Sequence, residues 1–496
     1  MIRIKQIDDP VIPELEEAAT SQTSTLFSFN GEDTTERYSE LWDMSRYTSV
    51  KPFLPPSPLG GLFSPLEATN SNMYQSIPEG WREIDHTQLG MPESALDSKG
   101  YYRASTGLVS MDGQALVFGK YDESDKLTEI AVAFRGTTSL GDVAAYVENL
   151  DAYQARTGFS YTDGFDDLLH AVKEHAMKNG LASTDVGVTG YSLGGAAVND
   201  MYTNREENWD GFYKDSLFFG NAPCFVKEGE NILNFGFEND TVHRAWLDGS
   251  DLKSTLLHMI DNKDVDFESS TDNMVLFSEL YALGLHAPLG AFSWFDPLSW
   301  EAHLQAAAMN PVDIIGSSNF YDQMSEDSRI VISNLMDFTR DFIWVKDKDS
   351  PSTSNADRSE GFVLGTDDGD RIADRSDSND FLDGFGGNDL FKISGGDDTV
   401  HGGDGYDTVM VKGKLSDYSF ARDEEGTVYM EHNSGKYGLD TLIDVEAISF
   451  KSSLFQRSHK VAVTEDGLVT TSRNGSTDIR PWDEYEIGPM DTFQVI

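Results

Sequence analysis

The sequence predicts a chain in two parts, an α/β domain followed by an all-β parallel β-roll. Three observations support this fold class. The 496 residues exceed what one hydrophobic core usually organises. Residues 1–345 mix strand-like and helix-like apolar patterns. After residue 360 the composition changes to glycine, aspartate and asparagine, with isolated apolar residues that recur every nine positions.

Changes of composition divide the chain further. A polar stretch, KDKDSPSTSNADRSE, separates the two parts and is typical of a linker. Beyond the repeats, short alternating segments with turn residues between them predict strands that cap the open end of the roll. We expect the α/β domain at 1–345, the linker at 346–360, the roll at 361–412, the cap at 413–480 and a C-terminal segment at 481–496.

Charge and cysteine content exclude several classes of protein. The chain carries 37 basic and 85 acidic residues, a net charge of −48, so nucleic acid and anionic membrane are not expected partners. With Cys224 as its one cysteine, it forms no intrachain disulfide. No apolar run approaches the roughly 18 residues that a transmembrane helix needs. The first residues lack an apolar signal-peptide core, so we expect no N-terminal signal peptide.

Four nine-residue repeats follow one another from Arg375 to Met410: RSDSNDFLD, GFGGNDLFK, ISGGDDTVH and GGDGYDTVM. Each has aspartate at position six and an apolar residue at position eight, and an earlier copy, GTDDGDRIA, is one residue out of phase. This is the pattern of the calcium-binding parallel β-roll. The expected calcium ligands are the position-six aspartates and turn glycines: Asp370, Asp380, Asp389, Asp398, Asp407, Gly387, Gly396 and Gly405.

The repeats need a cation for a physical reason. Glycine turns let backbone carbonyls and aspartate carboxylates converge on a hard cation such as Ca²⁺, while the position-eight residues form a thin apolar core. Without the cation the aspartates repel one another, so we expect the calcium-free repeats to be unfolded. The alternative, a disordered acidic linker, leaves the regular apolar positions unexplained.

A second motif, VTGYSLGGAAV, has the form Gly-x-Ser-x-Gly with Ser192 at its centre. The residues before it, Val186 to Thr189, have the pattern of a buried strand, and those after it begin a helix with small residues. This is the strand–elbow–helix of the α/β-hydrolase fold, which exposes a strained serine nucleophile. The alternative is a small polar residue in a tight turn.

A serine nucleophile needs a base, and the base needs an orienting acid. In α/β-hydrolases these follow the serine in the order Asp, then His. Asp240 ends a strand-like segment and suits the acid. Four histidines are available as the base, and spacing does not choose among His243, His258, His286 and His303.

The negative charge that develops on an attacked carbonyl needs hydrogen-bond donors. The backbone N–H of Leu193, at the start of the predicted helix, is one candidate. Thr137, which follows a buried strand-like segment in EIAVAFRGTTS, is a second through its N–H and hydroxyl. That segment is equally compatible with an ordinary turn at a strand end.

On these motifs the sequence resembles the bacterial family I.3 lipases, which are RTX-repeat, calcium-dependent triacylglycerol lipases exported by type I secretion. The segments that carry the resemblance span about residues 80–345 and include LVFGKYDESDKLTEIAVAFRGT, GYSLGGAAVNDM, GFENDTVHRA, ESSTDNMVLFSELYA and FYDQMSEDSRIVISNL. The ending, DTFQVI, resembles the C-terminal secretion signal of RTX proteins; a frayed terminus is the alternative.

The resemblance implies roles for particular residues. Ser192 would be the nucleophile, Asp240 the acid and His303 the base. A calcium site inside the α/β domain is implied for Glu238, Asp264, Asn273 and Asp327. Tyr191 departs from the family, which usually has histidine before the serine, and the chain lacks a longer loop after FRGTTS that holds a lid calcium in the family.

Two segments are candidate lids, because a lipase must cover an apolar groove in water and expose it at oil. Lys51–Glu67 is rich in Pro, Leu and Phe, and is either a flap over such a groove or a loop packed onto the core. Asp142–Tyr153 is either a second, amphipathic lid helix or an ordinary surface helix.

Together these observations predict a secreted, extracellular, monomeric enzyme of a Gram-negative bacterium. It would be a calcium-dependent lipase that hydrolyses acylglycerol carboxylic ester bonds at an oil–water interface through a Ser-His-Asp triad and an acyl-enzyme. Type I secretion machinery would export it. A phospholipase A1 or a broad esterase or polyesterase shares the triad. Two non-catalytic alternatives are a secreted RTX adhesin or surface module and an inactive hydrolase-fold scaffold.

Overall fold

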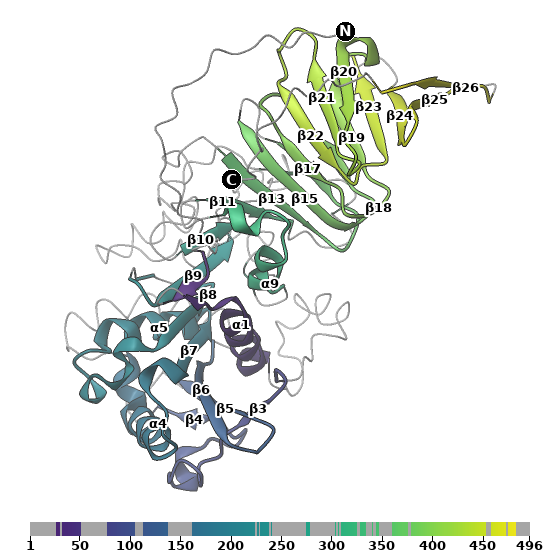
Figure 1. The fold of residues 1–496 in the computed structure, drawn as a ribbon. Coiled ribbons are helices and arrows are strands. Elements are labelled where there is room, and N and C mark those ends of the chain that lie inside the picture. The colour runs from purple at the N-terminus through teal and green to yellow at the C-terminus, as the bar shows by residue number, and fades with distance from the viewer. Residues whose placement is uncertain are drawn as a thin grey trace, which may run out of the picture.

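The structure, a computed structural model, describes residues 26–29, 32–50, 77–104, 113–136, 161–223, 226–227, 229–237, 240, 274–277, 303, 306, 309–324, 328–333, 340, 344–346, 360–374, 378–452, 458–472 and 475–482. Within these residues an α/β part and a β-roll lie end to end in an elongated molecule (Figure 1). Both candidate lids, Lys51–Glu67 and Asp142–Tyr153, lie outside the described residues, as do residues 347–359 and the ending DTFQVI.

One mixed sheet runs through both parts of the molecule. Among the described residues it has 16 strands, in the order β20-β21-β22-β17-β15-β13-β11-β10-β9-β8-β7-β6-β5-β3, with β18 beside β15 and β4 beside β5. From β6 to β22 along this path neighbouring strands are parallel, and antiparallel strands stand at both ends. The strands are β3 (Trp81–Glu83), β4 (Tyr102–Arg103), β5 (Gln114–Tyr121), β6 (Leu127–Phe134), β7 (Val186–Tyr191), β8 (Leu217–Asn221), β9 (Ile232–Phe237), β10 (Met274–Phe277), β11 (Arg329–Ile332), β13 (Glu360–Thr366), β15 (Asn379–Gly387), β17 (Thr399–His401), β18 (Asp404–Gly405), β20 (Tyr418–Arg422), β21 (Val428–His432) and β22 (Leu439–Ile443).

A second sheet forms the other wall of the β-roll. Its eight described strands follow the order β12-β14-β16-β19-β23-β24-β25-β26, parallel as far as β23 and antiparallel beyond it. They are β12 (Val345–Lys346), β14 (Arg371–Ala373), β16 (Leu390–Lys392), β19 (Thr408–Lys412), β23 (Ala447–Lys451), β24 (His459–Thr464), β25 (Gly467–Thr471) and β26 (Thr477–Arg480). A separate two-stranded hairpin pairs β1 (Ser28–Phe29) with β2 (Glu32–Asp33).

The described helices pack mainly on the α/β part. They are α1 (Thr35–Val50), α4 (Asp166–Lys178), α5 (Leu193–Asn204) and α9 (Pro311–Gly316), with short 3₁₀ turns η2 (Glu93–Ala95), η3 (Tyr161–Phe165), η4 (Ser183–Asp185), η5 (Trp209–Asp215), η6 (Tyr321–Gln323) and η8 (Leu415–Asp417). None of the described helices is long and apolar enough to span a bilayer.

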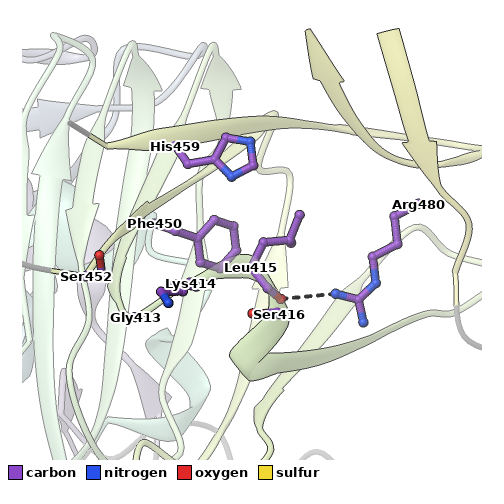
Figure 2. Close-up of a pocket in the computed structure, with 8 residues that line it drawn as sticks. All are labelled: Gly413, Lys414, Leu415, Ser416, Phe450, Ser452, His459 and Arg480. Carbon is purple, nitrogen blue, oxygen red and sulfur yellow. Dashed lines mark hydrogen bonds between the residues drawn. The ribbon is translucent and has the colours of Figure 1, made fainter. Parts of the chain in front are cut away.

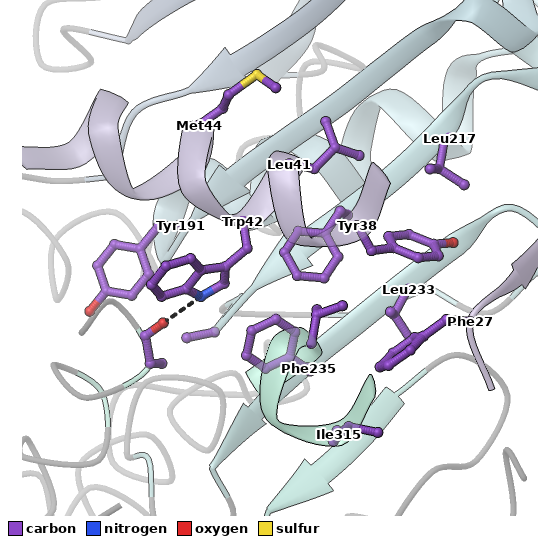
Figure 3. Packing of buried hydrophobic residues seen from close by; sticks show 14 of the residues in the cluster. Phe27, Tyr38, Leu41, Trp42, Met44, Tyr191, Leu217, Leu233, Phe235 and Ile315 are labelled. Atoms are coloured by element: carbon purple, nitrogen blue, oxygen red, sulfur yellow. Dashed lines mark hydrogen bonds between the residues drawn. The ribbon is translucent and has the colours of Figure 1, made fainter. Parts of the chain in front are cut away.

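Residues of the central strand β7 point alternately to the two faces of the sheet. A Cβ on Gly187 would lie 2.7 Å from the side chain of Leu41, so α1 packs closely against this point of the strand. Val186 and Val188 belong to a separate core cluster on the opposite face, with residues of α4 and α5. Period-two alternation therefore gives both faces an apolar cover, as a buried parallel strand requires. The α1 face gathers large aromatic side chains such as Trp42 and Phe235 (Figure 3).

The β-roll has a thin core between its two sheets. The position-eight residues of the four repeats, Leu382, Phe391, Val400 and Val409, are all fully buried there. Consecutive repeats place them alternately on β15 and β17 of one sheet and on β16 and β19 of the other. Full burial of such a side chain contributes roughly 1.5–3 kcal/mol, so the nine-residue apolar period is a direct source of stability.

The roll begins before the repeats. β11 pairs in parallel with β13, with Val331 opposite Val363, and Val331 and Val345 lie in the same core as the position-eight residues. The two parts of the molecule therefore share a continuous sheet at their junction, although we assigned Val331 and Val345 to the first domain. The domain boundaries themselves stay predictions.

A buried polar contact also joins the two parts. Asp383 on β15 accepts hydrogen bonds from Ser318 Oγ at 2.9 Å and from the Asn319 N–H at 2.8 Å, both from the turn after α9. Its register partner on β17 is His401, whose Nδ1 lies 3.4 Å from Asp383 Oδ1. A variable position of the repeat thus anchors the roll to the α/β part.

Candidate functional site

Ser192 stands on a sharp bend between β7 and α5. Its φ of 58° and ψ of −116° are strained for a residue with a side chain, as expected at a nucleophile elbow. Only glycine fits where the bend brings backbones together. A Cβ on Gly194 would lie 2.1 Å from the Phe134 carbonyl oxygen, and one on Gly190 would lie 2.3 Å from the Gly194 carbonyl. The flanking glycines of the motif are thus explained by close backbone approach.

The bend brings Ser192 to the predicted base and acid. Ser192 Oγ lies 3.0 Å from His303 Nε2, and His303 Nδ1 lies 2.6 Å from Asp240 Oδ2. All three residues are buried, with Asp240 fully so. Asp240 comes shortly after the end of β9, at the carboxyl edge of the parallel sheet where β7 also ends. Of the four candidate histidines, His303 is the one that the described residues place beside the serine.

Side chains around His303 hold its segment in position. Tyr191 Oη donates to the His303 carbonyl at 2.5 Å, and the Tyr191 ring stacks on the imidazole with centroids 4.9 Å apart. Three residues on, the Ala306 carbonyl accepts from Trp42 Nε1 at 3.0 Å (Figure 3) and from Asn221 Nδ2 at 3.1 Å. Helix α1 and strand β8 therefore both fix the segment that carries the base.

The helix start after Ser192 offers donors for an anion. Leu193 is the first residue of α5, where backbone N–H groups have no partner within the helix and the helix dipole favours negative charge. The end of β6 is close by, since a Cβ on Gly136 would lie 3.4 Å from Ser192 Cβ. Thr137, the second predicted donor, lies outside the described residues.

This geometry suits acyl transfer. A serine hydroxyl bonded to an imidazole, with that imidazole bonded to a buried carboxylate, can lose its proton as it attacks a carbonyl carbon. The chain is similar to bacterial lipases.

Two lipases from Pseudomonas fluorescens are each 36% identical to it, one over 303 residues, 58% of this chain and 60% of the lipase, and the other over 272 residues, 51% of this chain and 57% of the lipase. The aligned region therefore spans about three fifths of each curated relative. The crystal structure of the extracellular lipase LipA from Serratia marcescens matches with a TM-score of 0.70 and 26% identity, over 93% of this chain and 79% of that chain. No protein-family model matches the chain.

The calcium site that resemblance implies in the α/β part has all four of its residues outside the described ones: Glu238, Asp264, Asn273 and Asp327. In the part of the chain that the structure describes, no three His, Cys, Asp or Glu side chains come together as a metal-binding group.

The position-six aspartates line the turns of the roll, and three of them keep a free oxygen. Asp389 Oδ1 accepts the Asp370 N–H at 2.7 Å, and Asp407 Oδ1 accepts the Asp389 N–H at 2.8 Å; Asp398 Oδ1 accepts the Asp380 N–H in the same way. Within the described residues the second oxygen of Asp389, of Asp398 and of Asp407 is buried without a hydrogen-bond partner. A buried carboxylate oxygen with no donor fits a cation ligand.

Backbone carbonyls point toward the same places. A Cβ on Gly384 would lie 2.3 Å from the unpartnered oxygen of Asp389 and 2.4 Å from the Gly402 carbonyl oxygen. The position-four glycines Gly387, Gly396 and Gly405 have φ of 103°, 112° and 140°, which the tight turns require. The turns therefore bring carboxylate and carbonyl oxygens close together, as calcium coordination requires.

Asp440 and Glu446, which the sequence analysis missed, extend the two series in which the carboxylate of one turn accepts the N–H of the aspartate in the neighbouring turn. The Asp398 N–H donates to Asp440 Oδ1 at 3.3 Å, and the Asp407 N–H donates to Glu446 Oε2 at 2.7 Å. Both follow the same local pattern as the repeats, an acidic residue two positions before a buried apolar one, here Leu442 and Ile448. That spacing is the signal that would have found them.

Burial favours the neutral form of four of these carboxyls by raising their pKa values. Burial raises the pKa of Asp389 to about 8, that of Asp398 to about 9 and that of Asp440 to about 8, and neighbouring carboxylates add to each shift. Burial also raises the pKa of Asp407, to about 6. A bound cation would remove this cost by offsetting the negative charge of the ionised carboxylates.

A separate cavity of about 520 Å³ lies in the cap, between the turn after β19 and the strands β23, β24 and β26 (Figure 2). Lys414, Phe450, His459 and Arg480 are among the residues that line it. Arg480 donates to the Leu415 carbonyl at 3.1 Å, so its guanidinium serves the packing of the cap. No triad residue lines this cavity.

Proposed function

We propose that this chain is a secreted, calcium-dependent lipase that hydrolyses the carboxylic ester bonds of acylglycerols. The observation that carries the proposal is the hydrogen-bonded series from Ser192 Oγ through His303 to Asp240, at a strained elbow before a helix. The similarity to lipases of Pseudomonas fluorescens and Serratia marcescens supports this substrate class.

In the acylation step, Ser192 Oγ attacks the ester carbonyl carbon while His303 Nε2 accepts the hydroxyl proton. Asp240 keeps the imidazole in the tautomer with its proton on Nδ1 and stabilises the imidazolium that forms. The Leu193 N–H, with Thr137 as the second donor, stabilises the oxyanion. When the intermediate collapses, the ester C–O bond breaks and His303 gives its proton to the departing alcohol.

Deacylation repeats the sequence with water as the nucleophile. His303 Nε2 takes a proton from the water as it attacks the acyl-enzyme, and the second intermediate releases the fatty acid and returns the proton to Ser192 Oγ. A free acid, an alcohol and the unchanged enzyme result.

Calcium belongs to the roll in this proposal. The free oxygens of Asp389, Asp398 and Asp407 and nearby turn carbonyls would hold it, and the bound ion supplies positive charge that lets these carboxylates ionise inside the fold. Folding that depends on calcium suits export through type I machinery, because the cytosol is poor in calcium and the exterior is rich in it. The Serratia marcescens relative is an extracellular lipase, which supports secretion.

The proposal is tested with calcium-loaded full-length protein on emulsified triolein, soluble short-chain esters and phosphatidylcholine vesicles. We expect the wild type to release fatty acid fastest from the emulsion and Ser192→Ala to lose at least ~10⁴-fold in rate. Ser216→Ala is the matched control, because it removes a buried serine directly before β8, and it should keep full activity. Activity that survives in Ser192→Ala would end the proposal, and a preference for phosphatidylcholine would make the protein a phospholipase.

A further inference from the structure

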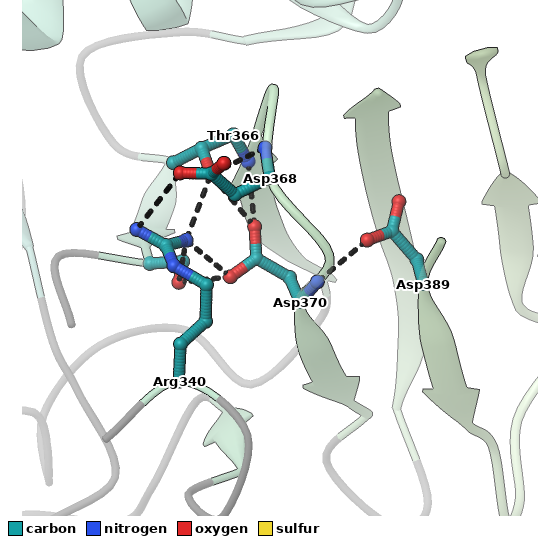
Figure 4. A network of polar contacts seen from close by, with 6 residues as sticks. Arg340, Thr366, Asp368, Asp370 and Asp389 are labelled. Carbon is teal, nitrogen blue, oxygen red and sulfur yellow. Dashed lines mark hydrogen bonds and ion pairs between the residues drawn. The ribbon is translucent and has the colours of Figure 1, made fainter. Parts of the chain in front are cut away.

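The first copy of the repeat differs from the copies that carry Asp389, Asp398 and Asp407 in how its aspartate is bound. Asp370 Oδ1 accepts hydrogen bonds from Arg340 Nη1 and Ser333 Oγ, each at 2.6 Å, and Asp370 Oδ2 accepts from the N–H and hydroxyl of Thr366 at 2.8 and 3.0 Å. Figure 4 shows Arg340 and Thr366 around the Asp370 carboxylate. Both oxygens are therefore occupied by protein donors, unlike those of Asp389, Asp398 and Asp407. Asp380 also accepts on both oxygens, from Ser378 Oγ at 3.0 Å.

Arg340 also supplies a full positive charge to this carboxylate. The Arg340 side chain is 10% exposed and that of Asp370 is 0% exposed, so the pair is removed from solvent. The guanidinium further contacts Thr366 Oγ1 at 2.7 Å and lies 4.0 Å from Asp368 Oδ2. The charge that a cation would bring to the other turns is thus already present here.

The phase shift of this copy explains the difference. Asp370 and Asp389 are 19 residues apart, whereas Asp389 and Asp407 are 18 apart. Thr366 occupies the register position of Phe385 in the next turn, where the backbone has a φ of 62°. The altered turn directs the amide and hydroxyl of Thr366 at Asp370 Oδ2. In the next turn the corresponding oxygen, Asp389 Oδ2, has no such donor.

We propose that Arg340 takes the place of calcium at the first turn, so that Asp370 binds the guanidinium instead of the metal and the turn Thr366–Asp370 forms without it. This inference rests on the proposed binding of calcium by the later turns. Arg340 comes from the segment between β11 and β12, next to the α/β part. The α/β part therefore presents a formed edge, β13, onto which the calcium-dependent turns fold.

Hydrogen exchange on the full-length protein tests whether the first turn is independent of calcium. In calcium-free buffer we expect the Thr366 N–H, whose acceptor is Asp370 Oδ2 within the first turn, to stay protected while the N–H groups of Asp398 and Asp407 exchange freely. Arg340→Met should raise exchange at the Thr366 N–H by at least ~10-fold, because it leaves the buried Asp370 carboxylate without its charge partner.

Arg371→Met is the matched control, since it removes the same charge next to this turn, at a residue of β14 whose guanidinium lies over the Trp344 ring. It should leave the first turn protected. The inference is wrong if the first turn of the wild type loses protection together with Asp398 and Asp407, or if Arg340→Met exchanges like the wild type.

Calcium stoichiometry separates this inference from the proposal on which it rests. Bound calcium, measured by equilibrium dialysis and elemental analysis, should be equal in the wild type and in Asp370→Asn but lower by at least one ion in Asp389→Asn. A loss of one ion in Asp370→Asn overturns the role of Arg340 alone. A wild type that binds no calcium overturns the calcium proposal itself.

Discussion

Tyr191→Phe tests how the base is held beside the nucleophile. Tyr191 Oη donates to the His303 carbonyl at 2.5 Å, and the Tyr191 ring stacks on the imidazole. Phenylalanine keeps the ring and its stacking and removes only the hydroxyl. The substitution therefore isolates the one hydrogen bond between the Tyr191 hydroxyl and the segment that carries the His303 imidazole.

The expected size follows from that single bond. A buried hydrogen bond between neutral groups contributes about 1 kcal/mol, and a rise of about 1 kcal/mol in the activation barrier slows a reaction roughly fivefold. We expect kcat on a soluble p-nitrophenyl ester to fall ~3- to 10-fold, with KM changed by less than ~2-fold, because the imidazole acts in the chemical step.

Tyr213→Phe is the matched control. Tyr213 is fully buried, and its hydroxyl donates to the Leu169 carbonyl at 2.6 Å, in a contact between η5 and α4 that contains no triad residue. Thermal unfolding by circular dichroism should show a similar loss of stability in both variants, whereas kcat should fall only in Tyr191→Phe. Equal kcat values in Tyr191→Phe and the wild type, or an equal fall in both variants, would refute the positioning role.

Three further predictions concern the acid, the elbow and the roll. Asp240→Asn should lower kcat by ~10³- to 10⁴-fold with an unchanged far-ultraviolet spectrum, because the imidazole loses its orienting carboxylate; a fall below tenfold would contradict this role. Gly194→Ala should abolish activity and lower Tm, because its Cβ would overlap the Phe134 carbonyl; a variant with wild-type Tm and activity would show that the elbow tolerates a side chain. In calcium-free buffer the roll should lose stability as pH rises from about 4 toward 8 or 9. The raised pKa values of Asp389 and Asp398 favour the folded state only while these groups are protonated. Urea unfolding midpoints at pH 5 and pH 8.5 measure this, and a higher midpoint at pH 8.5 would contradict it.

Local sequence patterns predicted the parts of the site that depend on neighbouring residues. The elbow at Ser192 is visible because glycine, strand and helix signals lie within about a dozen positions. The position-eight residues are visible because a β-roll repeats with a fixed period. Both features depend on residues at short, regular spacing, and such spacing can be recognised in a single sequence.

Contacts between residues far apart in the chain could not be predicted from these local patterns. His303 could not be distinguished from three other histidines by spacing, because the sheet brings it to Ser192 across 111 positions of chain. Arg340 gave no sign of binding Asp370, since nothing periodic links a residue before the repeats to one inside them. Asp440 and Glu446 were missed because the antiparallel strands β20 and β21 interrupt the period before the two series resume.

The reactivity of Ser192 is the central claim, and a fluorophosphonate probe measures it most directly. Intact-mass analysis of the calcium-loaded wild type should show one adduct, and peptide mapping should place it on Ser192. Ser192→Ala should take up no probe, and His303→Ala should react at least ~100-fold more slowly because the hydroxyl has lost its base. An unlabelled wild type, or an adduct on any other residue that persists in Ser192→Ala, would contradict the account.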